Sequence, residues 1–600
     1  MRRSRFAPLK TSLWLAAGFI LVREFWQLAF GSVSWHAAQT AVIGALPVAL
    51  TVIAFGVLNS LVDVTRIALW CARIPFGRNV GLAFAIGLST VAQSGQTARE
   101  VRAAQLMRGI RRPTTMLIPL LEHLVERAMG LGASLELRSF RTRNAFSARP
   151  GHIQCEQLTV RFGKKTVLEN VSCDIPAGTI TVLTGPTGSG KSTFLNAITG
   201  LAEHFSGATR TGRLQVAGID RSQPISATAR LIGYVPQEVR LGFVGNHAGD
   251  ELAFTARLRG IGATRLDGRE ISQLSAGECV QLAIESATLH QPSILILDEP
   301  LANLDTTERA RLIDELERRA AAGTTVLIAE HQTSELERLN PRWLTIESGA
   351  LREGKYQPET PKRTRASARI DADPTVHAER LNYRYRGEPR SVRTPIEWTA
   401  GQVIAVTGPN GSGKTSVLRG LARPEAGTTR VNGSTVEHRR PNPRQIAFVP
   451  EDPRMLFVCE TLAEELATAD KFAHARAGLT ELTLSSLLPH IDVPSIGAIH
   501  PRDLSTGTQR ALAIAIQLSH APAMLIIDEP TRGLDPRARQ EMAEVFDCVA
   551  ETGTVILFAT HDSDWASLVA DNEWTLHDGN LTHTGTPIRR HAAIRDGGEP

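Results

Sequence analysis

Gly185-Pro-Thr-Gly188-Ser-Gly190-Lys191-Ser192 is the stretch that decides the fold of this 600-residue chain, and it recurs as Gly408-Pro-Asn-Gly411-Ser-Gly413-Lys414-Thr415. Buried-strand patterns, Thr179 to Leu183 and Gln402 to Val406, lead directly into the two stretches. A strand, a glycine-rich loop and a helix in this order form a phosphate-binding loop, because the glycines let backbone N–H groups approach the phosphates and the helix adds its positive end. The repeat therefore predicts two similar nucleotide-hydrolysing domains in one chain.

The two loops carry the groups that ATP chemistry requires. Lys191 and Lys414 are expected to reach the β- and γ-phosphates of ATP. The hydroxyls of Ser192 and Thr415 are expected to ligate Mg²⁺. The loop residues predicted to bind ATP are Gly185, Pro186, Thr187, Gly188, Ser189, Gly190, Lys191, Ser192 and Thr193 in the first half, and Gly408, Pro409, Asn410, Gly411, Ser412, Gly413, Lys414, Thr415 and Ser416 in the second.

Each half also contains a hydrophobic strand that ends in Asp-Glu-Pro. The aspartates, Asp298 and Asp528, are expected to hold Mg²⁺ through its water shell. The adjacent glutamates, Glu299 and Glu529, can orient or deprotonate the attacking water. A solvated acidic turn is the alternative interpretation of each tripeptide, and the matched order of the elements disfavours it.

Two further segments, Leu274-Ser275-Ala276-Gly277-Glu278 and Leu504-Ser505-Thr506-Gly507-Thr508, resemble the signature loops of ATP-binding cassette proteins. In that family ATP is sandwiched between the phosphate loop of one domain and the signature of the other. The resemblance implies that the two halves pair within this chain and that each signature contacts the ATP of the opposite loop. The implied contacts are Ser275 and Gly277 in the first signature and Ser505 and Gly507 in the second.

The same resemblance assigns the remaining contacts. Gln237 occupies the Q-loop position, and the switch histidines that contact the γ-phosphate would be His331 and His561. Phe162 and Tyr385 lie where an aromatic residue would stack on adenine. The D-loop aspartates would be Asp305 and Asp535.

The second half departs from the family pattern in its Q-loop. Glu451, in Phe-Val-Pro-Glu, replaces the expected glutamine, and Thr508 replaces the usual last residue of the signature. The arginine expected slightly later is Gln281 in one half and Ala511 in the other. Because both catalytic glutamates and both histidines are present, we expect two hydrolytic sites of unequal rate.

The N-terminal quarter differs from the rest in charge and hydropathy. Residues 1–149 hold 18 Lys and Arg against 6 Asp and Glu, a net +12, whereas the whole chain carries +5. Thr40 to Leu58 contains no charged residue and is long enough to cross a bilayer. Weaker candidate spans are Leu13 to Phe30 and Val80 to Gln93. A buried soluble helix, a signal peptide and a nucleic-acid-binding arm are the alternatives, and we favour contact with a membrane.

Two motifs near the end of this region suggest what the ATPases drive. Ala104-Gln-Leu-Met107-Arg108-Gly109 and Leu135-Glu-Leu137-Arg138-Ser139-Phe140 resemble the motifs of the two coupling helices in the scaffold (T) subunit of energy-coupling-factor transporters. The resemblance implies that Arg108 and Arg138 make the coupling contacts, since a guanidinium forms forked bonds with carboxylates. The second motif has Ser139 in place of glycine.

The sequence thus predicts a multidomain protein with an all-α N-terminal region and two α/β nucleotide-binding domains. The resemblance implies an ATPase, with ATP and Mg²⁺, that drives uptake of a vitamin or transition-metal ion captured by a separate membrane-embedded (S) subunit. We expect it in the cell membrane, with the ATPase domains on the cytoplasmic side, in contact with lipid and not with nucleic acid. The alternatives are a soluble, translation-factor-like tandem ATPase and the ATPase of another importer. The expected boundaries are 1–145 (scaffold-like region), 153–351 (first ATPase domain), 352–374 (linker), 375–585 (second ATPase domain) and 586–600 (polar tail).

Overall fold

The computed structural model describes residues that all lie in one compact unit, Thr90–Pro600. They are residues 95, 97–137, 149–245, 247–259, 268–271, 274–302, 304–331, 333–356, 375–378, 381–385, 388–392, 396–423, 429–437, 442–577 and 579–585. Several predicted features lie outside the described residues: the membrane segments, Arg138, most of the linker and the polar tail. Within the described part of the chain, no helix combines the length and the apolar character needed to cross a bilayer.

The first α/β domain is built around a mostly parallel sheet. Its strands are β3 (Ile180–Thr184), β6 (Ile232–Val235), β7 (Ile294–Asp298), β8 (Thr325–Ala329), β9 (Arg342–Glu347) and β10 (Ala350–Glu353). They are ordered β10-β9-β3-β8-β7-β6, and β10 alone pairs antiparallel to its neighbour. Every residue of β7 and β8 is buried, as expected for a parallel sheet with both faces covered.

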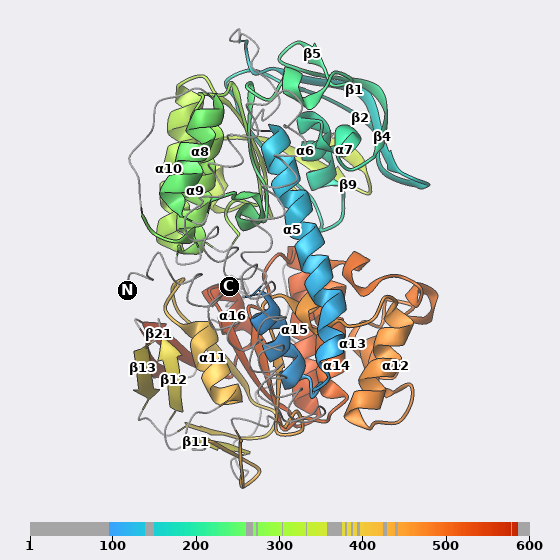
Figure 1. Ribbon diagram of the computed structural model, residues 1–600, viewed down its shortest axis with the longest axis vertical. Coiled ribbons are helices and arrows are strands. Elements are labelled where there is room, and N and C mark those ends of the chain that lie inside the picture. Colours follow the sequence, from blue (N-terminus) through green and yellow to red (C-terminus); the bar gives the residue numbers. More distant parts are fainter. Residues whose placement is uncertain are drawn as a thin grey trace, which may run out of the picture. The chain divides into compact units, whose positions relative to one another are not determined.

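An antiparallel sheet and a set of helices complete this domain. The sheet consists of β1 (Ile153–Phe162), β2 (Lys165–Ile175), β4 (Thr209–Val216) and β5 (Ile219–Asp220), in the order β2-β1-β4-β5. The helices are α6 (Lys191–Thr199), α7 (Leu201–His204), α8 (Ala248–Arg259), α9 (Ala276–Thr288) and α10 (Thr306–Ala321). Figure 1 shows α8, α9 and α10 side by side, and both α8 and α10 contact α9.

The second domain repeats this plan. Its main sheet has the order β18-β19-β20-β15-β21-β22, and smaller antiparallel sheets are formed by β14-β11-β16-β17 and by β12-β13. The strands are β11 (Val376–Ala378), β12 (Leu381–Tyr385), β13 (Glu388–Val392), β14 (Ile396–Trp398), β15 (Val403–Thr407), β16 (Thr429–Val431), β17 (Ser434–Thr435), β18 (Ile446–Val449), β19 (Met524–Asp528), β20 (Val555–Thr560), β21 (Asn572–His577) and β22 (Asn580–Gly585). The helices are α11 (Lys414–Ala422), α12 (Leu462–Ala473), α13 (Leu479–Leu487), α14 (Thr506–Leu518), α15 (Pro536–Glu551) and α16 (Ser563–Val569). The expected pair of α/β domains is therefore confirmed.

Both signature segments lead directly into a helix. Ser275 is the N-cap of α9: its hydroxyl accepts from the N–H of Glu278, whose carboxylate accepts in return from the N–H of Ser275. Ser505 caps α14 by accepting from the N–H of Thr508. Such caps satisfy N–H groups that have no partner inside the helix.

Among the described residues, two helical segments precede the first domain. The sequence predicts a helix that continues to Pro113, but the helix covers residues 97–107, because Gly109 adopts a left-handed φ of +80° that ends it. The next segment forms η1 (Pro113–Met116) and α5 (Leu117–Leu137), drawn in blue in Figure 1. α5 contacts η3 (Val239–Gly242) of the first domain and η6 (Pro453–Leu456) of the second.

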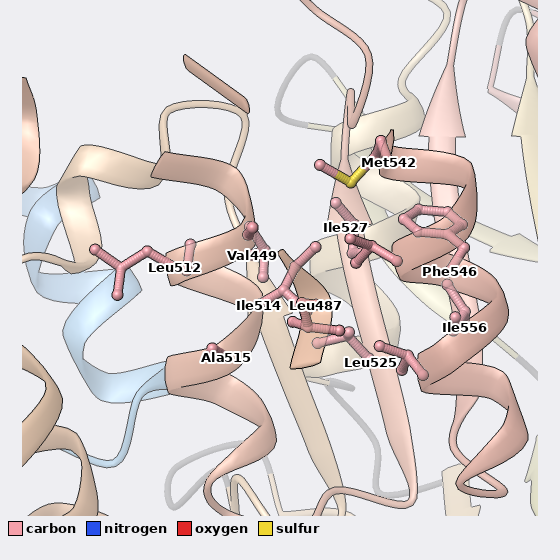
Figure 2. Close-up of a cluster of buried hydrophobic side chains, with 14 of the residues drawn as sticks. Val449, Leu487, Leu512, Ile514, Ala515, Leu525, Ile527, Met542, Phe546 and Ile556 are labelled. Atoms are coloured by element: carbon pink, nitrogen blue, oxygen red, sulfur yellow. The ribbon is translucent and has the colours of Figure 1, made fainter. Parts of the chain in front are cut away.

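One of the two core clusters of the second domain lies between its main sheet and helices α13 to α15. Figure 2 shows Met542 and Phe546 of α15 directed toward Ile527 of β19, with Ile514 of α14 nearby. The rings of Phe546, Phe558 and Trp565 pack edge to face, with centroids 5.3–5.4 Å apart. This geometry suits aromatic quadrupoles and fixes α15 against the sheet.

Phe546→Ala would remove a ring that is 1% exposed together with two of these edge contacts. We expect it to lower the unfolding free energy of the second domain by about 3–5 kcal/mol, because a cavity is left behind. Leu482→Ala, at a residue 70% exposed, should stay within about 0.5 kcal/mol of the parent. Urea unfolding of the full-length chain, followed by tryptophan fluorescence, measures both variants. Equal midpoints for the two would contradict the assigned core.

Candidate active sites

The first phosphate loop is held in a conformation that only glycine permits. Gly185 has φ +140°, and a Cβ atom there would lie 2.1 Å from the carbonyl oxygen of Ile346. Gly190, at φ +110°, is the N-cap of α6. The Nζ atom of Lys191 donates to the carbonyls of Gly185 (2.9 Å) and Pro186 (3.0 Å). Burial lowers the pKa of Lys191, so its charge lies in a site where an anionic phosphate would be favourable.

The second loop has the same geometry. A Cβ atom on Gly408, at φ +150°, would lie 2.2 Å from the carbonyl oxygen of Leu576. The Nζ atom of Lys414 donates to the carbonyls of Gly408 (2.8 Å) and Pro409 (3.3 Å). In this loop the ammonium also lies 3.7 Å from Oε1 of Glu529.

The first site brings three predicted catalytic side chains together. Nε2 of Gln237 donates to Oε2 of Glu299 at 2.8 Å, and Nε2 of His331 lies 2.8 Å from Oε1 of the same carboxylate. Glu299 follows strand β7 at φ +49°, an uncommon conformation for a non-glycine residue. A carboxylate between an amide and an imidazole, beside a phosphate loop, can orient and deprotonate a water molecule.

The second site holds its glutamate differently. Nδ1 of His561 lies 3.0 Å from Oε2 of Glu529, and buried Arg510 donates to the backbone carbonyl of Glu529 at 2.7 Å. Burial opposes the charge of Glu529, but His561 and Lys414 outweigh it and hold the pKa below its ordinary value. The carboxylate therefore stays ionised, as a general base must.

Both strand-terminal aspartates offer a place for a divalent cation. Asp298 and Asp528 are buried, and neither Oδ1 atom has a hydrogen-bond partner among the described residues. Burial raises the pKa of each to about 7, with the charge of Glu299 adding to the effect at Asp298 and that of Glu451 at Asp528. An orphaned buried carboxylate oxygen beside a hydroxyl fits Mg²⁺, which would neutralise this charge and that of the phosphates. Ser192 and Thr415 supply the hydroxyls, each hydrogen-bonded to the aspartate of its own site.

The two aromatic residues predicted to stack on adenine lie in unlike surroundings. Phe162 ends strand β1 and is only half-buried. Tyr385 is 9% exposed, and its hydroxyl donates to the carbonyl of Gly411 at 2.5 Å. A Cβ atom on Gly413 would lie 2.8 Å from the Tyr385 ring, so this ring supports the phosphate loop. Adenine stacking stays a prediction for both residues.

The described contacts between the two domains involve the predicted D-loop of the second. The N–H of Thr187, in the first phosphate loop, donates to Oδ2 of Asp535 at 2.5 Å. A small cavity between the domains is lined by Glu299, His331 and His561 and by residues 531–534. The pairing of each phosphate loop with the opposite signature stays a prediction.

The first signature has its own local partner. The hydroxyl of Ser275 donates to Oε1 of Glu308 at 3.1 Å, and a Cβ atom on Gly277 would lie 2.3 Å from Cδ of Glu308. Glu308 also belongs to the capping box formed with Asp305 at the start of α10. A side chain at this position would therefore displace the carboxylate of Glu308 from the signature serine. In the second signature, Gly507 has room, since its nearest neighbour would be 3.5 Å away.

The sequence pattern missed two arginines at the second site. Arg510 lies one residue before Ala511, which occupies the position of the arginine in the family pattern. It also donates to the carbonyl of Arg532 at 2.9 Å. Arg532 forms an ion pair with Glu451. The unusual acid of the second Q-loop, Glu451, therefore has a cationic partner. The signal in the sequence was that the Q-loop and the signature both depart from the family pattern in this half.

Comparison with known proteins agrees with this geometry. The model of the family described as "ABC transporter" matches residues 168–302 and 395–532. A protein of Streptomyces avermitilis named "Putative ABC transporter ATP-binding protein" is 32% identical over 530 residues, covering 72% of this chain and 93% of that protein. A Bacillus subtilis protein named "Putative HMP/thiamine import ATP-binding protein" is 26% identical over 508 residues, covering 72% of this chain and 91% of its own.

Among solved structures, one described as "Model of ribosome-bound archaeal Pelota and ABCE1" aligns with a TM-score of 0.50 and 21% identity, covering 71% of this chain and 78% of that one. At this identity the likeness concerns the fold alone.

Glu299→Gln and Glu529→Gln test the two candidate general bases separately. Each should lower hydrolysis at its own site by about 10²–10⁴-fold, because an amide cannot accept the proton of water. The residual rates of the two single variants should differ, since only the first glutamate is contacted by a Q-loop glutamine. Steady-state release of phosphate from ATP measures this, with the exposed Glu544→Gln as the matched control. A double variant that retained the parent rate would refute both assignments.

Proposed function

The chain belongs to the ABC transporter family and is an ATPase with two cassette domains; from this premise we propose that it is the energy module of an energy-coupling-factor importer. In this proposal the N-terminal region is the membrane scaffold, and the cassettes lie on its cytoplasmic side. A separate membrane-embedded subunit captures the solute, a vitamin or a transition-metal ion. The import function in the name of the Bacillus subtilis relative supports the vitamin class for this chain.

The observation that carries the proposal is the burial of Arg108. Its side chain is 0% exposed, and Nη1 lies 2.5 Å from Oε1 of Glu465, which is also 0% exposed. The same nitrogen donates to the carbonyl of Leu456. A basic helix that only follows a membrane surface would keep its guanidinium in water. Insertion of this arginine into the second cassette is what a coupling contact requires.

The first cassette contains a matching acceptor. Oε2 of Glu465 accepts from the N–H groups of Val458 and Cys459 at 2.7 and 2.8 Å. In the first cassette, Oε2 of buried Glu251 accepts from the N–H groups of residues 244 and 245 at 2.8 and 2.9 Å. Because the two carboxylates are held alike, Glu251 is the acceptor that we propose for Arg138.

Helix α5 supports the presence of a membrane partner. Leu117, Leu121, Val125 and Met129 are 51–58% exposed and recur at every fourth residue. Residues at this spacing share one side of a helix. The acidic residues between them face the second cassette instead, where Glu122 lies 2.5 Å from Arg502. An exposed apolar stripe on a side of the helix next to the cassette-bound face fits contact with a hydrophobic subunit.

Arg108→Ala should uncouple the cassettes from the scaffold. The change leaves Glu465 as an unpaired buried charge, which typically costs about 3–5 kcal/mol. We expect ATP hydrolysis to persist while the scaffold helix becomes accessible to limited proteolysis and nucleotide-dependent transport is lost. Arg112→Ala, at an exposed residue of the same segment, is the matched control. Equal protection of residues 97–107 in both variants would contradict the coupling role.

The importer function itself is tested by fractionation and pull-down. The full-length chain should resist extraction by carbonate and high salt, and in detergent it should co-purify with a small, very hydrophobic membrane protein. Release without detergent, or recovery of ribosomes in place of a membrane partner, would favour a soluble translation-factor-like ATPase. Leu121→Glu with Val125→Glu should reduce recovery of the membrane partner while ATPase activity is retained.

A further inference from the structure

Arg532 contacts carboxylates from both cassettes. Nη1 of Arg532 pairs with Oε1 of Glu451 in the second Q-loop, and Nη2 lies 3.6 Å from Oε1 of Glu238 in the first cassette. At the equivalent positions the first cassette has Ala302 in place of the arginine and Gln237 in place of Glu451. The acid and the arginine thus occur together in one cassette, and both are replaced by uncharged residues in the other.

The backbone of Arg532 is fixed relative to the second catalytic glutamate. Arg510 is 3% exposed, and its two terminal nitrogens donate to the carbonyls of Glu529 (2.7 Å) and Arg532 (2.9 Å). A displacement of the Arg532 loop would therefore be transmitted to the turn that carries Glu529.

The other contact of Arg532 leads toward the first catalytic glutamate. Glu238 directly follows Gln237, whose amide donates to Glu299 at 2.8 Å. Arg532 also lines the cavity between the cassettes together with Glu299 and His331. A continuous series of contacts therefore joins the two catalytic glutamates, and Arg532 is the member that crosses between the cassettes.

We propose that Arg532 is a positioning residue shared by both nucleotide sites. It neutralises Glu451, so that an acid can occupy the second Q-loop, and it links this loop to the first Q-loop through Glu238. Without the arginine, Glu451 would place a negative charge beside Asp528 and the phosphates, where repulsion between like charges opposes nucleotide binding. The proposal rests on ATP hydrolysis alone and does not depend on the importer function.

The exposure of these side chains separates a positioning role from a structural one. Arg532, Glu451 and Glu238 are 28%, 44% and 51% exposed. Ion pairs at this exposure add little to folding stability. Loss of Arg532 should therefore leave the midpoint of thermal unfolding near that of the parent, even though it alters catalysis.

The first test uses rescue. Arg532→Ala should lower kcat/KM for ATP hydrolysis by the full-length, detergent-solubilised chain roughly tenfold, chiefly through a higher KM. Adding Glu451→Gln should bring the rate back to within about threefold of the parent, because an amide needs no counter-charge. Arg537→Ala is the matched control, since this exposed arginine in the same segment pairs only with Glu541 among the described residues. A double variant as slow as Arg532→Ala, or Arg532→Ala as fast as the control, overturns the neutralising role.

The second test addresses the link between the sites. In a Glu299→Gln, Glu529→Gln background, which binds ATP without turnover, ATP binding should be cooperative. Arg532→Ala and Glu238→Gln should each bring the Hill coefficient to about 1. Glu238→Gln leaves Glu451 paired, so it separates the link from the neutralisation. Independent binding in the background protein, or cooperativity that survives both changes, overturns the link. Neither result bears on whether a membrane partner is present.

Discussion

The close approach of each phosphate loop to a neighbouring strand is the constraint on which the rest of the structure depends. At Gly185 and Gly408 the chain passes so near a strand carbonyl that a side chain has no room. Because of this approach, the backbone N–H groups of the loop and the N-terminus of the following helix both point toward the site where the phosphates bind. The lysine, the strand-terminal aspartate and the catalytic glutamate then surround one point because parallel strands end at one edge of the sheet.

The two sites share this frame and differ in what surrounds the catalytic glutamate. In the first, the amide of Gln237 and the imidazole of His331 contact Glu299. In the second, Lys414 and His561 contact Glu529, and charged Glu451 and Arg532 occupy the adjoining loops. Beyond the histidine that both sites share, the first glutamate is contacted by an uncharged amide, and the second is contacted by an ammonium group and lies beside a paired acid and arginine. Because interactions between charges are screened by salt and neutral hydrogen bonds are much less so, the two sites depend on different physical terms.

The sequence was sufficient to predict the features that depend on local order. A strand, a glycine loop and a helix occupy adjacent positions in the chain, so the phosphate loops and the Asp-Glu-Pro turns could be placed before their surroundings were known. Arg532 and Arg510 could not be assigned in this way, because their partners are set by packing between distant segments. The end of the first helix at Gly109 was also missed, since a glycine inside an apolar pattern does not reveal its φ angle.

Some long-range partners did leave a signal in the repeat. Phe243-Val244 precedes Glu251 by the same interval at which Phe457-Val458 precedes Glu465. Aligning the two halves with each other would have identified both carboxylates as equivalent. It would not have shown that an arginine from outside the repeat contacts Glu465 in the second cassette, because that contact joins positions that are 357 residues apart.

The contact between Arg108 and Glu465 also has a consequence for how the protein assembles. Where a helix of this kind and its cassettes are separate polypeptides, they meet by diffusion, and their complex dissociates on dilution. Here the arginine and its acceptor belong to one molecule, so their association is unimolecular and independent of protein concentration. One copy of the segment that carries Arg108 is fixed for every two cassettes when the chain is synthesised, and no imbalance in expression can change that ratio.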